Sequence, residues 1–338
     1  MTTIRDIAQE SGVSVSTVSR VLAGHPDVSP ATAAVVNAVI ERHHFHVNRN
    51  ASNLKRGNTT SILVMVKGRY NMLFAAMMEH VQAAVTATGH TVIAQYIDED
   101  DNEVAEAERW VAEVKPCGVV FLGADARHME QSHLLGQNCP AVVLTNSLDG
   151  LVRPAISCVT TDDRAAAGAA IGYLIDNGHR RIGVIGGQPA QSSISAHRQS
   201  GVIEAMAARG VKFDLATHYF ATRFSLESGY RAAQRLLESA PDITAIYAMG
   251  DIMALGAIRG LYERGMRVPD DISLIGHDGI EPALYVVPKL TTVRQPQEAI
   301  VARGVEILMR HLGGDPTPVA QTMDVEIVSG ESVRCLAE

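Results

Sequence analysis

From Ser61 onward, short runs of β-branched and other apolar residues alternate with segments of helical periodicity. Continuous apolar strands separated by helices of about 10–15 residues are typical of βαβ units with a buried parallel sheet. The length of this part of the chain predicts two doubly wound α/β sheets rather than one. The predicted strands are Ser61–Val66, Thr91–Ile97, Gly118–Leu122, Ala141–Leu144, Ile182–Ile185, Ala245–Met249 and Ile272–Ile275, with a closing strand near Met323–Val328. The predicted helices are Phe74–Thr88, Arg164–Asn177, Ser200–Arg209, Ser228–Ser239 and Met253–Arg264.

Residues 1–57 follow a different pattern, in which apolar residues recur at the spacing of three short helices. Ser11–Ser14 is typical of a tight turn, and Ser29 followed by Pro30 is typical of an N-cap and first helical position. The segment Ile4–Gly24 therefore predicts a helix-turn-helix, with an ordinary helical hairpin as the alternative. Its second helix displays Val15, Ser16, Thr17, Ser19 and Arg20. Such a face suits DNA, because arginine can grip guanine while small hydroxyl residues bond phosphates or bases.

The charge of the chain is unevenly divided. The formal net charge of the 338 residues is −8, which argues against a protein that coats nucleic acid by bulk electrostatics. Residues 1–57 hold six Lys or Arg and four Asp or Glu, a net charge of +2, which leaves −10 for the remainder. The acidic run 98–103 lacks the glycine and glutamate of a calcium loop, so it predicts a solvated face.

Several classes of protein are disfavoured. The four cysteines are isolated, which argues against a disulfide framework or a zinc cluster. No signal-peptide core and no long apolar span occur, so a soluble cytoplasmic protein is expected. No hydrolase or nucleotide-binding signature occurs either, so we expect no catalytic residue, no metal and no cofactor.

Five segments, in order along the chain, resemble one known family. The segment Thr3–Leu22, TIRDIAQESGVSVSTVSRVL, is similar to the N-terminal signature of the lactose-repressor (LacI/GalR) family of bacterial transcription regulators. The other segments that resemble family motifs are Asn71–Ala75, Asn177–Gly187, Val268–Asp278 and Pro288–Pro296. The resemblance thus covers nearly the whole chain.

The resemblance implies a small all-α helix-turn-helix head and an α/β core of two doubly wound subdomains, shaped like a periplasmic sugar-binding protein. Residues 1–47 would be the DNA-binding domain, 48–60 the hinge helix and linker, and 61–338 a two-lobed effector-binding and dimerisation domain. Lobe 1 would span about 61–160 and 291–322, and lobe 2 about 161–290 and 323–338. The expected protein is a homodimeric, ligand-responsive regulator, a repressor, on a palindromic double-stranded operator, because protein symmetry mirrors operator symmetry.

The resemblance also implies roles for individual residues. The expected base contacts are Val15, Ser16, Arg20 and Leu54, with Leu54 as a wedge in the minor groove. The expected phosphate contacts are Ser14, Thr17, Ser19, Ser29, Thr32 and Asn48. The expected binding residues for a small polar effector, a sugar or sugar derivative, are Asn71, Phe74, Asp162, Ser192, Arg198, Phe224, Asp251, Asp278 and Gln295.

The chain departs from the family pattern at four positions. Gly250 and Gly279 stand where the family commonly has Asn and Asp, so part of the polar lining is lost. Val47 replaces the proline that precedes the hinge, and His277 replaces an aromatic residue, where a packed histidine is favoured over a titrating one. Three alternatives stay open: a solute-binding protein of the same core fold, a carboxylate-pair enzyme using Asp251 and Asp278, and a transcriptional activator.

Overall fold

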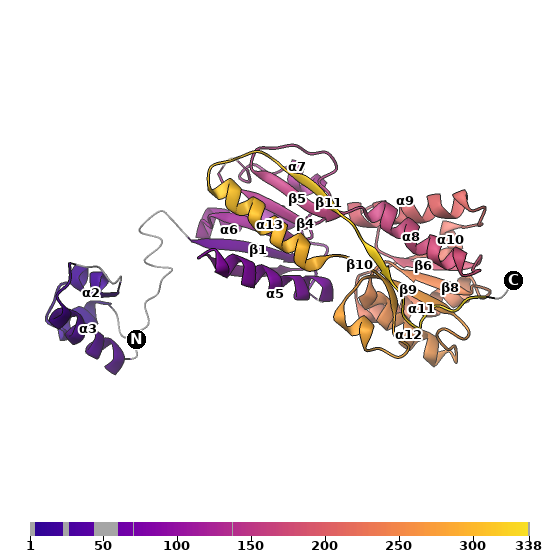
Figure 1. Cartoon of the computed structure of the whole chain (residues 1–338), viewed down its shortest axis with the longest axis horizontal. Helices are drawn as coiled ribbons and strands as arrows, with labels where there is room; N and C mark the ends of the chain where they lie inside the picture. The colour runs from indigo at the N-terminus through magenta and orange to yellow at the C-terminus, as the bar shows by residue number, and fades with distance from the viewer. Residues whose placement is uncertain (1–3, 23–26, 44–59, 70, 137, 337–338) are drawn as a thin grey trace. The chain divides into compact units, whose positions relative to one another are not determined.

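The computed structural model describes residues 4–22, 27–43, 60–69, 71–136 and 138–336 (Figure 1). The chain divides into two compact units, Met1–Thr59 and Thr60–Glu338. Within the described residues, no helix combines the length and the apolar character needed to cross a bilayer.

The first unit contains α1 (Ile4–Glu10), α2 (Val15–Leu22) and α3 (Pro30–Arg42). Ile7, Val18 and Val36 are fully buried between these helices. Ser29 caps α3, as the sequence predicts, by accepting a hydrogen bond from the Thr32 amide at 3.1 Å. The prediction of three short helices with a turn between the first two is confirmed.

The second unit contains two six-stranded sheets, each covered by helices on both faces. The first sheet has the strand order β11-β5-β4-β3-β1-β2 and is parallel throughout. Helices α5 and α13 pack on one of its faces, and α6 with α7 packs on the other. Its strands are β1 (Ser61–Lys67), β2 (Thr91–Ile97), β3 (Gly118–Leu122), β4 (Ala141–Thr145), β5 (Ile156–Thr161) and β11 (Ala320–Met323). Its helices are α5 (Met72–Ala87), α6 (Glu103–Val114), α7 (Ala126–Glu130) and α13 (Gln297–Leu312).

The second sheet has the order β12-β10-β9-β8-β6-β7, and its strands are parallel except for β12. Helices α8 and α9 cover one face, and α11 and α12 cover the other. Its strands are β6 (Ile182–Gly186), β7 (Tyr219–Ala221), β8 (Ala245–Ala248), β9 (Ser273–Asp278), β10 (Thr291–Arg294) and β12 (Glu326–Val328). Its helices are α8 (Asp163–Asp176), α9 (Ser193–Ala208), α10 (Leu215–His218), α11 (Leu226–Ser239) and α12 (Asp251–Glu263), with a 3₁₀ helix at Glu281–Leu284.

The predicted fold class, an all-α head and an α/β core of two doubly wound sheets, is confirmed. One expected boundary is wrong: Thr291–Arg294 belongs to lobe 2, because β10 pairs with β9 and β12 of the second sheet. The closing strand is two strands, β11 and β12, one in each sheet (Figure 1). The chain therefore passes between the lobes after β5, after β10 and after β11.

Candidate functional site

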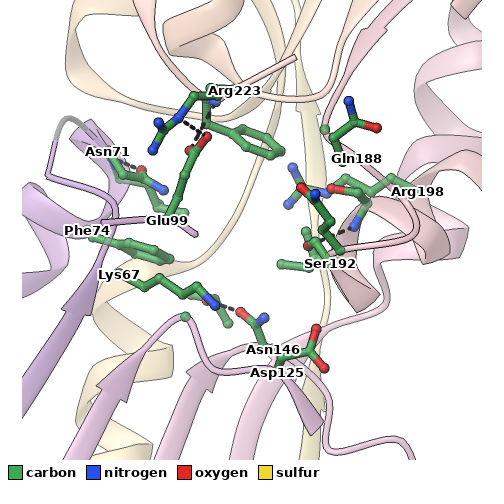
Figure 2. Close-up of a pocket in the computed structure, with 18 of the residues that line it drawn as sticks. Lys67, Asn71, Phe74, Glu99, Asp125, Asn146, Gln188, Ser192, Arg198 and Arg223 are labelled. Carbon is green, nitrogen blue, oxygen red and sulfur yellow. Dashed lines mark hydrogen bonds and ion pairs between the residues drawn. The ribbon is translucent and has the colours of Figure 1, made fainter. Parts of the chain in front are cut away.

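A cleft lies between the two lobes, where the carboxyl ends of strands from both sheets meet. Lys67 and Thr145 end β1 and β4, and Asp278 ends β9. This is where open parallel sheets place ligand sites, because strand-to-helix loops gather there. Figure 2 shows Lys67, Asn71 and Phe74 on the lobe 1 wall and Gln188, Ser192 and Arg198 on the lobe 2 wall. The residues that follow strand ends in the lining are Glu99, Asp100, Gly123, Ala124, Asp125, Asn146, Gly187, Gln188, Thr222, Arg223 and Gln295.

Arg198 is the buried cation of lobe 2, with 2% of the residue exposed. Its Nε donates to Asp163 Oδ1 at 2.7 Å, and one terminal nitrogen donates to the Met249 carbonyl. The other terminal nitrogen lies 3.6 Å from Asp278 Oδ1. Burial raises the pKa of Asp278 to about 6, against the opposing charge of Arg198. Asp278 also has a φ of 107°, an uncommon backbone conformation that is found most often at functional sites.

Two polar atoms of the cleft are buried without a protein partner. Gln295 donates from Nε2 to Asp278 Oδ1 at 2.9 Å, which leaves its Oε1 oxygen unpaired. The Ser195 hydroxyl is unpaired as well. Leaving such a group unsatisfied costs about 1–3 kcal/mol, so a ligand that hydrogen-bonds to it gains that amount. The lobe 2 wall thus contains polar atoms that can form hydrogen bonds with a polar ligand.

Two phenylalanine rings, Phe74 and Phe224, belong to the apolar part of the lining, and glycines lie against both. A Cβ on Gly187 would lie 2.7 Å from the Phe224 ring, and one on Gly250 would lie 3.1 Å from it. On lobe 1, a Cβ on Gly123 would lie 2.9 Å from the Phe74 ring. A side chain at the departure position Gly250 would therefore be in tight contact with the Phe224 ring.

Polar contacts join the two lobes beside the cleft. Arg223 of lobe 2 donates to Glu99 of lobe 1 at 2.5 Å and also pairs with Asp98. On the other side, Asp125 of lobe 1 accepts from the Ser193 amide of lobe 2 at 3.0 Å. The expectation that 98–103 is a solvated face is wrong for Glu99, which lines the cleft, and for Glu103, which is fully buried, whereas Asp100 and Asp101 are exposed. Their partners come from distant segments, which a local pattern does not reveal.

Seven of the nine predicted effector residues line the cleft: Asn71, Phe74, Ser192, Arg198, Phe224, Asp278 and Gln295. Asp162 does not, because it caps α8 by accepting from the Ala165 amide at 2.9 Å and lines a separate groove between α8 and α9. Asp251 is also not part of the lining. Its fully buried carboxyl accepts from Thr292 Oγ1 at 2.7 Å and from the amides of Gly279 and Ile280 at 2.8 and 2.9 Å.

His277 is a packed histidine. It is fully buried, and its Nδ1 is hydrogen-bonded to the Tyr247 hydroxyl at 2.8 Å. Burial lowers the pKa of His277 well below its usual range, so the ring is neutral in the folded protein. Gly279 has a φ of +71°, and a Cβ there would lie 2.5 Å from the Arg294 side chain, which explains the glycine at this departure.

The prediction from sequence does not include Lys67, Glu99, Asp125, Asn146, Gln188 and Arg223, all of which line the cleft. One signal could have found them: each stands at, or just after, the carboxyl end of a strand. The rule for ligand sites in open α/β sheets selects these positions before any contact is known.

The exposed face of α2 is the second candidate site. Val15 is 42% exposed, and Ser16, Ser19 and Arg20 are exposed beside it. Ser14 caps α2 by accepting from the Thr17 amide at 3.1 Å. The N-terminal ends of α2 and α3 thus display hydroxyl groups where the helix dipole favours an anion, an arrangement suited to phosphate. The remaining predicted contacts, Asn48 and Leu54, lie outside the described residues.

Comparisons with known proteins agree with this arrangement. The model of the family described as bacterial regulatory proteins, lacI family, matches residues 3–48, and that of a periplasmic binding protein-like domain matches residues 171–333. The chain is 32% identical to the HTH-type transcriptional regulator MalR of Clostridium butyricum, over 97% of this chain and 98% of the relative.

Solved structures show the same architecture. A complex of the transcriptional regulator CelR with cellobiose is 27% identical, with a TM-score of 0.71 over 98% of this chain and 100% of that one. A lac repressor dimer bound to operator and the anti-inducer ONPF is 22% identical, with a TM-score of 0.80 over 98% of this chain and 99% of that one, and shows the fold. With a helix-turn-helix unit, a two-lobed core and a full-length relative at this identity, the chain belongs to the lacI family of bacterial regulatory proteins.

Proposed function

We propose that this chain is a ligand-responsive, sequence-specific transcriptional repressor, which binds a palindromic operator as a homodimer and a small sugar-like effector in the cleft. The observation that supports the proposal best is a cleft with buried, unpartnered polar atoms in the same chain as a helix-turn-helix unit. The alternative function, solute binding, would explain the cleft but not the exposed polar face of α2.

The first part of the proposal concerns DNA. Arg20 offers a planar guanidinium that can donate twice to guanine, and Val15 offers an apolar contact to a thymine methyl group. The net charge of +2 on residues 1–57 gives modest attraction to phosphate, so two linked heads have to share the operator to bind it tightly. Asn48 and the wedge Leu54 complete the proposed contacts.

The second part concerns the homodimer. The last residue of the 3₁₀ helix, Leu284, is exposed together with Tyr285 and Val287 that follow it, with 75% of Tyr285 and 88% of Val287 accessible. Contiguous exposed apolar side chains of this size mark interaction surfaces more often than free surface. We place the contact between two copies of the chain here, and sedimentation of Tyr285→Asp should then give monomers where the wild type gives dimers.

The third part concerns the effector. Buried carboxylates and an arginine can bond hydroxyl groups, and Phe74 and Phe224 can cover the apolar face of a sugar ring. The cellobiose held by the CelR relative is a ligand of this kind. Because the cleft is shared by both lobes, a ligand bound there changes the balance between lobe arrangements according to its differential affinity.

The test is an in vitro selection of operator DNA from a random duplex library with the full chain, followed by binding assays. We expect a palindromic consensus that is bound by two chains. Reporter expression then separates repression from activation. A selection that yields no consensus, or a non-symmetric site bound by one chain, would contradict the proposal.

A further inference from the structure

Lobe 1 contains an ion pair beside the cleft, Lys67 with Glu103, that the sequence pattern does not predict. Glu103, at the start of α6, is 0% exposed, yet its carboxyl group receives several donors. Lys67 Nζ donates to Oε2 at 2.6 Å, and the Asp125 amide donates to Oε1 at 2.7 Å. His128 Nδ1 lies 3.1 Å from each carboxyl oxygen. Burial pushes the pKa of Glu103 upward, but the His128 hydrogen bond and the Lys67 charge outweigh it, so the carboxyl is ionised.

Lys67 is the member of this group that reaches the cleft. It ends β1, its side chain is 17% exposed, and it extends along the lobe 1 wall toward Asn146 (Figure 2). An ammonium group has three N–H donors, and Glu103 accepts one of them. Within the described part of the chain, the other two have no partner. Lobe 1 thus presents the N–H donors of Lys67 to the cleft, and the buried carboxylate of Glu103 cancels the positive charge of that ammonium group.

The lobe 2 wall contains a buried oxygen that accepts hydrogen bonds. Gln295 Oε1 is an amide carbonyl oxygen and can only accept, while Nε2 of the same side chain donates to Asp278. The Ser195 hydroxyl lies unpartnered in the same lining. A ligand that hydrogen-bonds to both Lys67 and Gln295 Oε1 therefore needs an acceptor oxygen toward lobe 1 and a donor group toward lobe 2.

The cations of the lining are all paired. Lys67 has Glu103, Arg198 has Asp163 at 2.7 Å, and Arg223 has Glu99 at 2.5 Å. An anionic ligand would meet no uncompensated positive charge among the described lining residues. A phosphate or carboxylate would also lose its hydration without a hydrogen to offer Gln295.

We propose that Lys67, held in place by Glu103, determines ligand specificity at the lobe 1 wall, and that the cleft selects uncharged, hydroxyl-rich ligands over their anionic counterparts. Lys67 touches the ligand, whereas Glu103 is a positioning residue that also cancels the charge. The inference rests on the proposed function, since it specifies the class of effector that the cleft takes.

The test uses pairs of probes that differ in charge: ribose with ribose 5-phosphate, glucose with gluconate, and cellobiose with cellobionate. Affinities of the full chain are measured by isothermal titration calorimetry. We expect the wild type to bind the uncharged member of at least one pair at least about tenfold more tightly, a difference of about 1.4 kcal/mol. Equal or tighter binding of the anionic member would overturn the inference, while binding of no probe would contradict the proposed effector function itself.

Variants separate charge cancellation from a merely structural ion pair. In Glu103→Gln the single amide oxygen can still accept from Lys67, at the loss of the hydrogen bond from the Asp125 amide, but the positive charge is no longer cancelled. The ratio of affinities should then shift at least about tenfold toward the anionic probe. An unchanged ratio would overturn the role of Glu103. The matched control is Glu108→Gln on the same helix, whose carboxyl accepts from the His133 and Leu134 amides outside the cleft and should leave the ratio unchanged.

The donor role of Lys67 is tested by the double variant Lys67→Met, Glu103→Gln, which avoids leaving a buried carboxylate without a partner. We expect it to bind the uncharged probe roughly ten- to a hundredfold more weakly, the range for losing a hydrogen bond from a charged donor. It should not gain affinity for the anionic probe. Wild-type affinity for the uncharged probe would show that Lys67 does not contact the ligand.

Discussion

Replacing Arg198 with methionine removes the cation at the centre of lobe 2 and keeps most of the side-chain volume. In the wild type, Asp163 accepts from Arg198 Nε at 2.7 Å, and Asp278 lies 3.6 Å from its terminal nitrogen. All three residues are buried, so the variant leaves two carboxyl groups without their counter-charge. Breaking a buried ion pair by removing one partner costs about 3–5 kcal/mol. We expect the free energy of unfolding of the core to fall by about that amount at pH 8.

The loss should depend on pH, and its sign follows from the pKa shifts. Burial raises the pKa of both Asp163 and Asp278, and Arg198 opposes that rise. Without Arg198, both folded-state pKa values lie further above the unfolded value, which is about 4. A raised carboxyl pKa lowers stability as the pH increases between the unfolded and the folded value. The deficit of Arg198→Met should therefore be smaller at pH 5 than at pH 8.

Urea-induced unfolding of the full chain, followed by far-ultraviolet circular dichroism at pH 5 and pH 8, measures both effects. The control is Arg164→Met, because Arg164 forms an exposed pair with Glu204 on the neighbouring helices α8 and α9. Exposed pairs contribute about 0–1 kcal/mol, so the control should stay near the wild type. A deficit for Arg198→Met below about 1 kcal/mol, or one that is equal at the two pH values, would show that Arg198 does not stabilise the fold by balancing Asp163 and Asp278.

Three further substitutions test other parts of the account. Burial raises the pKa of Asp278 to about 6, so the free energy of unfolding of the wild type should fall as the pH rises from about 4 to about 6. In urea titrations, Asp278→Asn should show a weaker dependence of this free energy on pH. An equal dependence in the two proteins would argue against a buried, titrating carboxyl. Ser29→Ala removes the cap of α3 and should cost about 1 kcal/mol of local stability, seen as faster hydrogen exchange of α3 amides. Arg20→Ala should weaken operator binding by about 1–3 kcal/mol and relax selection at one base pair of each half-site, whereas an unchanged consensus in a repeated selection would remove Arg20 from base recognition.

Most of the fold could be predicted because buried parallel strands are continuous apolar runs. The run Gly118–Leu122 coincides with the fully buried strand β3, and Thr91–Ile97 coincides with β2, an edge strand that is only partly buried. The pattern fails where a strand is very short, as in β7 (Tyr219–Ala221), or mixed in polarity, as in β5 (Ile156–Thr161) and β10 (Thr291–Arg294). For β10 the sequence also does not specify the partner strand, which is set by register with β9 across the sheet. The assignment of residues 291–294 to lobe 2 could therefore not be predicted from the pattern of apolar residues.

The site shows the same division between local and long-range information. Asp278 ends β9, and Asp251 follows shortly after the end of β8. Both carry a carboxyl group that could accept hydrogen bonds from the hydroxyl groups of a sugar. The structure separates them, since Asp278 lines the cleft while Asp251 turns to the amides of Gly279 and Ile280. That choice depends on side-chain direction, which residue spacing does not encode. The Lys67–Glu103 pair joins residues 36 positions apart, so it is likewise outside any local pattern.

We propose that ligand binding in the cleft and DNA binding by the helix-turn-helix unit are coupled through one chain. The direct measurement is the dissociation constant for the selected operator, by fluorescence anisotropy, with and without a saturating uncharged ligand identified by calorimetry. We expect bound ligand to change this constant by roughly 5- to 150-fold, the range of ordinary allosteric coupling. An operator affinity that is the same with and without bound ligand would contradict it.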